Sequence, residues 1–229
     1  MTLHVDAERL LDRIRQLGQV GRGEDGSLTR LAASDADKAA RDVLTGWIEA
    51  AGLEVAVDRL GNLFGIWRPV STPDMAPVMI GSHIDTVVDA GVYDGCYGVL
   101  AGLEVLSTLK RAGFEPSCPM VVAAFTNEEG VRYAPDMMGS LVFAGGLAVE
   151  EKKLGTEQSG ALDVRRGGLC RVGGGADIRQ QFHPVPVACR TLTGRPRKRR
   201  SAAARTLLEL GDVVGRGRDD DLADAAVDG

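Results

Sequence analysis

Two polar motifs, each directly after an apolar run, constrain the fold of this chain more than any other feature. The first reads Gly-Ser-His-Ile-Asp-Thr at residues 81–86 and follows the apolar run 78–80, which predicts a buried strand. At strand spacing, His83 and Asp85 share a face at the strand's carboxyl end, where open α/β sheets form their sites. A metal-bound imidazole commonly donates its other N–H to a carboxylate, and this pair offers both groups. A strand end with two solvated polar residues is the alternative reading of His-x-Asp alone.

The second motif follows a helix and another strand. Residues 96–112 place apolar side chains at helical spacing, so Asp94 is either the N-cap of this helix or part of the same site. The run 120–125 predicts a fully buried strand, after which come Glu128 and Glu129. Successive side chains there diverge, so one carboxylate can bind a metal while its neighbour faces a metal-bound water.

The rest of the N-terminal part alternates helices with strands. We expect helices over 7–17 and from a Ser34 cap to residue 51, and a strand hairpin over 53–57 and 63–67. This alternation indicates the α/β class, with a mostly parallel sheet flanked by helices. His83, Asp94, Glu128 and Glu129 are then expected to converge at one edge of the sheet.

The motifs GSHIDTV, YDG, FTNEEGVRY and MMGS, in this order and spacing, resemble the co-catalytic metal amidohydrolases of the zinc-peptidase superfamily. Within it the chain is most similar to N-carbamoyl-L-amino-acid hydrolases, β-ureidopropionases and allantoate amidohydrolases. The resemblance covers residues 8–150, so it implies a partial zinc-peptidase-like catalytic domain over residues 1–155. It also implies a further helix over residues 141–147. It implies hydrolysis of a linear amide or ureido C–N bond in a small molecule of the N-carbamoyl-L-amino acid or allantoate type.

The resemblance also assigns roles to five residues. It implies that His83 binds one divalent ion, that Asp94 bridges two ions, and that Glu129 binds the second. Glu128 is then the general base, and Asp85 orients His83. The ions are zinc, or manganese or cobalt; such a pair lowers the pKa of a shared water, whose proton a nearby carboxylate can take.

Residues 156–229 form an irregular tail rich in Arg and Gly, without family match or sustained periodicity. The basic run 195–200 could be a nucleic-acid patch or a targeting signal, but it lacks interleaved aromatic residues and a binding fold. The other interpretation is an out-of-frame translation of a GC-rich gene. We therefore expect a tail that is disordered or out of frame, and we interpret His183 as a loop residue.

The family resemblance implies further parts that this sequence does not show. Relatives should continue into another metal-binding His and a dimerisation or lid domain, so we expect a truncated chain that is weakly active or inactive. Homodimers are expected of the family, but the dimerisation domain is absent here. Two alternatives stay open: an aminoacylase or peptidase of the same superfamily, and a non-catalytic remnant whose basic tail binds nucleic acid.

Composition excludes several other classes. The chain has 229 residues, a net charge of −5 and no apolar run near the ~20 residues that span a bilayer. Its N-terminus lacks the basic start and apolar centre of a signal peptide. The four cysteines form no CxxC pair, which is typical of reduced thiols in a cytoplasmic protein.

Overall fold

The computed structural model describes residues 3–147, 154–157 and 160–162. All contacts discussed below lie within the compact unit that begins at Asp6. Most of the predicted tail, including His183 and the basic run 195–200, lies outside the described residues. Among the described helices, none is both long and apolar enough to cross a membrane.

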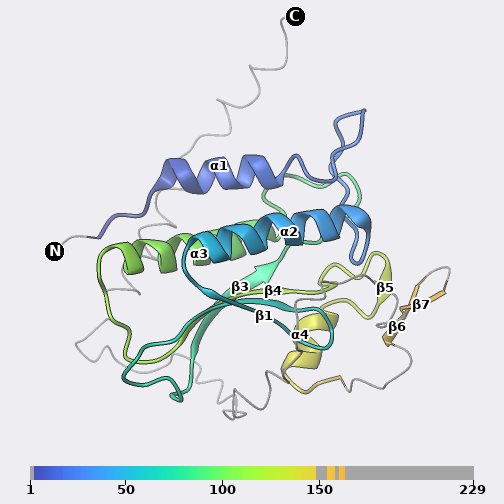
Figure 1. The fold of residues 1–229 in the computed structure, drawn as a ribbon. Coiled ribbons are helices and arrows are strands. Elements are labelled where there is room, and N and C mark those ends of the chain that lie inside the picture. Colours follow the sequence, from blue (N-terminus) through green and yellow to red (C-terminus); the bar gives the residue numbers. More distant parts are fainter. Residues whose placement is uncertain (1–2, 148–153, 158–159, 163–229) are drawn as a thin grey trace, which may run out of the picture. The chain divides into compact units, whose positions relative to one another are not determined.

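A four-stranded sheet forms the centre of this unit (Figure 1). Its strands, in spatial order, are β1 (Glu54–Val57), β2 (Leu63–Trp67), β4 (Met120–Phe125) and β3 (Val78–His83). The α/β class is therefore confirmed. The expectation of a mostly parallel sheet is wrong for the described residues, because β1 with β2 and β2 with β4 pair antiparallel and only β3 with β4 pairs parallel. A short turn joins β1 to β2 and can give only an antiparallel pair, whereas a helix connects β3 to β4.

Helices cover both faces of the sheet. Figure 1 shows three on one side, α1 (Ala7–Leu17), α2 (Asp35–Ala50) and α3 (Cys96–Arg111), and α4 (Met138–Phe143) on the other. The alternation of β4 explains this arrangement: Val122 faces α3, while Val121 and Ala123 belong to the cluster that packs against Phe143 of α4. The helix that the resemblance implies at 141–147 thus begins and ends earlier, at Met138 and Phe143.

Local sequence signals set the beginnings of the N-terminal helices. Asp6 accepts a hydrogen bond from the backbone N–H of Arg9, and Ser34 accepts one from that of Asp37. The Ser34 cap is therefore confirmed. These side chains satisfy N–H groups that would otherwise lack an intrahelical partner.

Two glycines let α3 lie close to the sheet. A Cβ on Gly98 would come within 2.9 Å of the Ser82 Cβ, and one on Gly102 within 3.0 Å of the Ile80 Cγ2. The helix is buried from Val99 to Leu109. This close packing fixes the N-terminal end of α3 beside the end of β3, where His83 lies.

The two strands predicted as buried differ. Strand β4 is buried over almost all its length, which confirms the prediction. Strand β3 is not: Val78 is 51% exposed, and only His83 at the strand's end is fully buried. Within the described residues β3 pairs with β4 alone, so one of its edges has no neighbouring strand.

A second, small sheet follows β4. It consists of β5 (Tyr133–Ala134), β6 (Leu154–Glu157) and β7 (Gly160–Leu162), paired antiparallel in that order. These strands are too short to show periodicity in the sequence, which explains why they were not predicted.

Candidate metal centre

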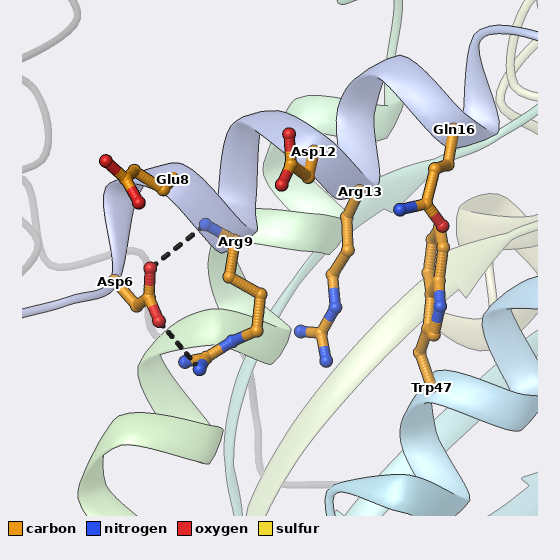
Figure 2. A pocket seen from close by; sticks show the side chains of 7 residues that line it. All are labelled: Asp6, Glu8, Arg9, Asp12, Arg13, Gln16 and Trp47. Carbon is orange, nitrogen blue, oxygen red and sulfur yellow. Dashed lines mark hydrogen bonds and ion pairs between the residues drawn. The ribbon is translucent and has the colours of Figure 1, made fainter.

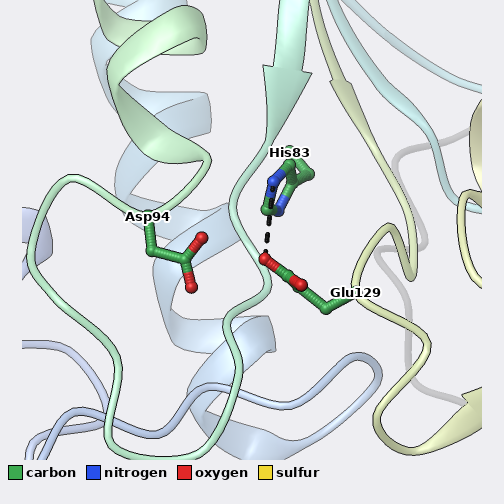
Figure 3. A group of neighbouring side chains, drawn as sticks. All are labelled: His83, Asp94 and Glu129. Carbon is green, nitrogen blue, oxygen red and sulfur yellow. Dashed lines mark ion pairs between the residues drawn. The ribbon is translucent and has the colours of Figure 1, made fainter.

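Three ligand-type side chains from three separate elements converge at the carboxyl end of β3 (Figure 3). His83 is the last residue of β3, Asp94 lies in the loop before α3, and Glu129 follows β4. One ligand atom from each lies within 4.8 Å of the other two. The convergence follows from the fold, because parallel strands β3 and β4 end at the same edge and α3 begins there.

The imidazole of His83 has a defined orientation. Its Nδ1 lies 2.8 Å from the backbone carbonyl of Asp85 and 3.8 Å from the Asp85 carboxylate. The carbonyl can only accept, so Nδ1 carries the hydrogen and Nε2 of the neutral ring keeps its lone pair for a ligand. The hydrogen bond of His83 to Asp85 thus involves the backbone carbonyl, with the carboxylate farther away, and the orienting role of Asp85 stays a prediction.

The carboxylate of Asp85 contacts the segment that follows β4. It accepts the backbone N–H groups of Glu128 and Glu129, each at 3.2 Å. The side chain is buried, and burial raises the pKa of Asp85, against the opposing effect of the hydrogen bond from Glu128. This contact ties the end of β4 to the loop after β3.

The two adjacent glutamates do not diverge as their sequence positions predict. The Glu128 Oε2 lies 3.3 Å from the His83 Nε2, and the Glu129 Oε1 lies 3.9 Å from the same nitrogen. Asn127 has a positive φ of 53°, and its buried amide donates to the carbonyls of Tyr133 and Pro135. This turn brings both carboxylates back over the imidazole.

Asp94 does not cap α3 with its side chain. The N-cap of α3 is Gly95, with no side-chain capping hydrogen bond, and the Asp94 carboxylate accepts the backbone N–H of Val87 at 3.3 Å. Of the two roles left open by the sequence, the position within the site is the one that the structure supports.

The carboxylates lie close enough to share a proton. Partial burial, then a hydrogen bond with Asp94 and the charge of Asp94, raise the pKa of Glu129 to about 7, while His83 opposes the rise. An imidazole and two or more carboxylates are the donors that zinc, manganese and related divalent ions accept in proteins. A divalent cation would remove the repulsion between these carboxylates, so the donor set fits such an ion.

Arg30 supports the loop that follows His83, and the sequence analysis did not predict this role. Its buried guanidinium donates to the carbonyl of Ile84 at 2.6 Å and to that of Val20 at 2.6 Å. Its backbone also exchanges hydrogen bonds with Thr86. Arg30 therefore fixes the loop that follows His83. A buried arginine has no periodic signature, so only its place in a family motif could have indicated it.

A second buried network supports the segment after β4. Arg41 pairs with Asp37 at 3.0 Å and donates to the Thr126 hydroxyl at 3.2 Å. The Thr126 N–H donates to the Asn62 side chain at 2.9 Å, and Asn62 donates in turn to the carbonyl of Gly139. Helix α2, the turn before β2 and α4 are thereby joined behind the two glutamates.

Comparison with known proteins identifies the family. The model of peptidase family M20/M25/M40 matches residues 79–207, more than half of the chain. The chain belongs to this family. The resemblance seen in the sequence is thereby confirmed.

Several curated proteins are similar at the sequence level. An N-carbamoyl-L-amino-acid amidohydrolase from Rhizobium meliloti is 44% identical over 141 residues, which are 62% of this chain and 34% of that protein. An allantoate deiminase from Arabidopsis thaliana is 39% identical over 150 residues, 65% of this chain and 28% of that protein. The chain thus spans about a third of the length of the curated relatives it matches.

The fold agrees with that of a solved amidase structure. A hydantoinase/carbamoylase family amidase from Burkholderia ambifaria superposes with a TM-score of 0.68 and 39% identity, over 73% of this chain and 41% of that one. The family and the His–Asp–Glu cluster together indicate that the chain binds divalent metal. The family match continues past the boundary expected at residue 155, and that boundary stays a prediction.

Proposed function

We propose that this chain supplies part of the centre of a metal-dependent hydrolase that cleaves a linear ureido or amide C–N bond. The observation that carries the proposal is the convergence of His83, Asp94 and Glu129 within 4.8 Å at one sheet edge. The names of the relatives, an N-carbamoyl-L-amino-acid amidohydrolase and an allantoate deiminase, support this bond type.

Each ligand has a distinct role in the proposal. In this proposal, His83 would hold one divalent ion through Nε2, Glu129 would hold a second, and Asp94 would contribute to holding both. The ions are zinc, or manganese or cobalt. When bound, they lower the pKa of a shared water and polarise the carbonyl of the substrate.

Glu128 acts as the general base. Its carboxylate lies beside the ligands, 3.3 Å from the His83 Nε2, and it is partly open to solvent. It takes the proton of the attacking water and passes it to the leaving nitrogen. Asp85 acts as a positioning residue, because its backbone orients His83 and its carboxylate holds the N–H groups of both glutamates.

We expect the isolated chain to bind metal loosely and to turn over slowly or not at all. A catalytic ion of this kind takes about three protein ligands. The described residues offer His83 and Asp94 to one ion, and Asp94 and Glu129 to the other. A cytoplasmic location, a family-type homodimer and the disordered or out-of-frame tail stay predictions from the sequence.

Metal binding by the purified chain is the first test. Equilibrium dialysis against zinc, manganese or cobalt should show binding that chelators reverse readily, and His83→Ala should abolish it. The control is His4→Ala, because His4 lies outside the cluster. Binding that is equal in both variants would contradict the assigned centre.

Activity is best tested in a chimera, where the expected weak turnover of the isolated chain does not limit the assay. Residues 1–147 would replace the matching part of the Rhizobium meliloti relative, to which the chain is 44% identical. We expect hydrolysis of N-carbamoyl amino acids or allantoate, lost in Glu128→Gln with metal content unchanged, and retained in Glu24→Gln at an exposed site. Cleavage of N-acyl amino acids or dipeptides alone would favour the aminoacylase or peptidase alternative. A correctly folded, metal-loaded chimera without any activity would favour the non-catalytic remnant.

A further inference from the structure

We propose that a cation-lined pocket at the far end of α3 binds a small dianion of the phosphate type. The pocket has a volume of about 340 Å³, which is within the range of small-molecule sites. Its lining combines four cationic side chains with small residues: Arg9, Arg13, Lys110 and Arg111, with Ala50, Ala51, Gly52 and Ser107.

This pocket is separate from the metal centre. The centre lies before the first residue of α3, Cys96, whereas Lys110 and Arg111 are the last two residues of the helix. At 1.5 Å per residue, a helix of 16 residues puts its ends roughly 24 Å apart. An anion in the pocket would therefore not touch the metal ligands.

A neighbouring cavity differs from this pocket in the charge of its lining. It has a volume of about 430 Å³ and shares Arg9 and Arg13, which project from α1 on the same side (Figure 2). Its lining also contains the carboxylates of Asp6, Glu8 and Asp12, which would repel an anion. The pocket between α1, α3 and the end of α2 has no carboxylate in its lining.

The charges around the pocket leave an excess of positive charge. Arg9 pairs with the buried Glu104 at 2.9 Å and also with Asp6, while Arg13 and Arg111 lie 3.7 and 3.6 Å from Glu104. With Lys110, four cations line the pocket, while its own lining has no carboxylate, so positive charge predominates there. A dianion would balance it.

Arg13 has one donor that no hydrogen bond satisfies, although its guanidinium lies over the Trp47 ring, 5.7 Å from the ring centroid. Its side chain is only 12% exposed, and its Nη1 atom is buried without a hydrogen bond. The Glu104 oxygen at 3.7 Å is too far for one. A buried cationic donor without an acceptor is unfavourable, and a small turn of this side chain toward the adjoining pocket would bring the donor to an oxyanion there.

The other cations fit a phosphate oxygen at the rim. Arg111 is 53% exposed and can turn its guanidinium inward, and a guanidinium donates to phosphate through two parallel N–H groups. Lys110 donates to the carbonyl of Gly52, which covers the negative end of α2 that would otherwise oppose an anion. These features favour a compact tetrahedral dianion over a larger ligand.

Inorganic phosphate is the probe for the test. Thermal unfolding of the full chain is followed against phosphate concentration at fixed ionic strength, with a chelator present so that metal ions cannot bind phosphate. We expect a saturable rise of the unfolding midpoint that chloride does not give, and ³¹P line broadening with the same saturation.

Three variants make the test specific. Arg111→Gln, at the exposed rim, should weaken phosphate binding about tenfold or more, the scale of one charge-assisted hydrogen bond. Arg13→Lys keeps the charge but loses the fork and should weaken binding as well. Arg15→Gln removes the same charge from an exposed position on α1 outside the pocket and should bind as the native chain does. The proposal is overturned if phosphate has no saturable effect, if all three variants respond alike, or if a dicarboxylate of equal charge binds more tightly than phosphate.

Discussion

Gly95 lies directly against the imidazole ring of His83. It has a φ of +61°, and a Cβ built on it would overlap the Nδ1, Cε1 and Nε2 atoms of the ring. Only a residue without a side chain can occupy this position while the ring keeps its orientation. The conformation of the turn before α3 and the direction of the proposed metal ligand are thus set by the same residue.

Gly95→Ala should therefore weaken metal binding and lower stability together. The new methyl group either displaces the ring or strains the turn, since alanine rarely adopts a positive φ. We expect a loss of metal affinity of roughly tenfold or more, measured by competition with a chelating dye. Gly91→Ala is the matched control, because a Cβ there meets nothing within 4 Å. Equal affinities in the two variants would show that ring placement does not depend on Gly95.

Asp85→Asn tests the contact between the two sides of the site. The amide keeps one acceptor oxygen, but its NH₂ group would face a backbone N–H of Glu128 or Glu129. We expect shifted amide resonances for both glutamates and a metal affinity lower by about 10- to 100-fold, as for other groups that position ligands. Asp89→Asn, at an exposed turn with a φ of 54°, should leave both unchanged. Unaltered glutamate resonances in Asp85→Asn would contradict the contact.

The raised pKa of Glu129 predicts a pH dependence of the metal-free chain. The ordinary pKa of this side chain is 4.5, and in the folded chain it is about 7. Between these two pH values the Glu129 carboxyl keeps its proton in the folded chain but has lost it in the unfolded chain. The contribution of Glu129 to stability therefore falls as pH rises across this range and levels off above it. Urea unfolding at several pH values, with a chelator present, should show a smaller decline in Glu129→Gln than in the native chain.

Metal binding should respond to pH in the opposite direction. A ligand carboxylate must lose its proton before it binds, so affinity should increase as pH rises through about 7. Proton release on metal addition, measured in two buffers of different ionisation enthalpy, gives the same information. Affinity that is constant from pH 5 to 8 would contradict the proton shared by Glu129 and Asp94.

Two ion pairs on α2 offer a comparison of buried with exposed charge. Arg41 with Asp37 is buried, whereas Lys38 with Asp42 has the same four-residue spacing on the exposed face. Arg41→Met leaves Asp37 buried with an unpaired charge and should lower the free energy of unfolding by about 3–5 kcal/mol. Lys38→Met should cost about 0–1 kcal/mol. Similar losses in urea unfolding would show that the Arg41 network does not support the fold.

The sequence predicted the elements whose signal is local. Helix α2 begins after Ser34 because the cap acts within three residues, and the apolar run 120–125 forms a buried strand. The motif order likewise predicted that His83 and Glu129 would meet. Each of these expectations depends on short-range spacing or on a strand ending next to another.

What the sequence could not show depends on contacts between distant segments. The exposed edge of β3 follows from its having β4 as its sole neighbour within the described residues, which no property of residues 78–80 reveals. The hydrogen bond of His83 to the Asp85 carbonyl depends on where the chain turns after the strand. Arg30 contacts Ile84, and Gly95 lies against the ring of His83. In both cases the partner belongs to another segment of the chain, so the residue's own sequence neighbours do not reveal the contact.

The parallel pairing that sets His83 opposite Phe125 has a consequence for how the chain folds. If β3 slipped by one residue against β4, the side chain at each position would turn to the other face, and the imidazole would leave the carboxylates. A divalent ion held by His83, Asp94 and Glu129 would thus bind only to chains in which the two strands are correctly aligned. Metal binding would therefore stabilise the native strand register relative to registers shifted by one residue.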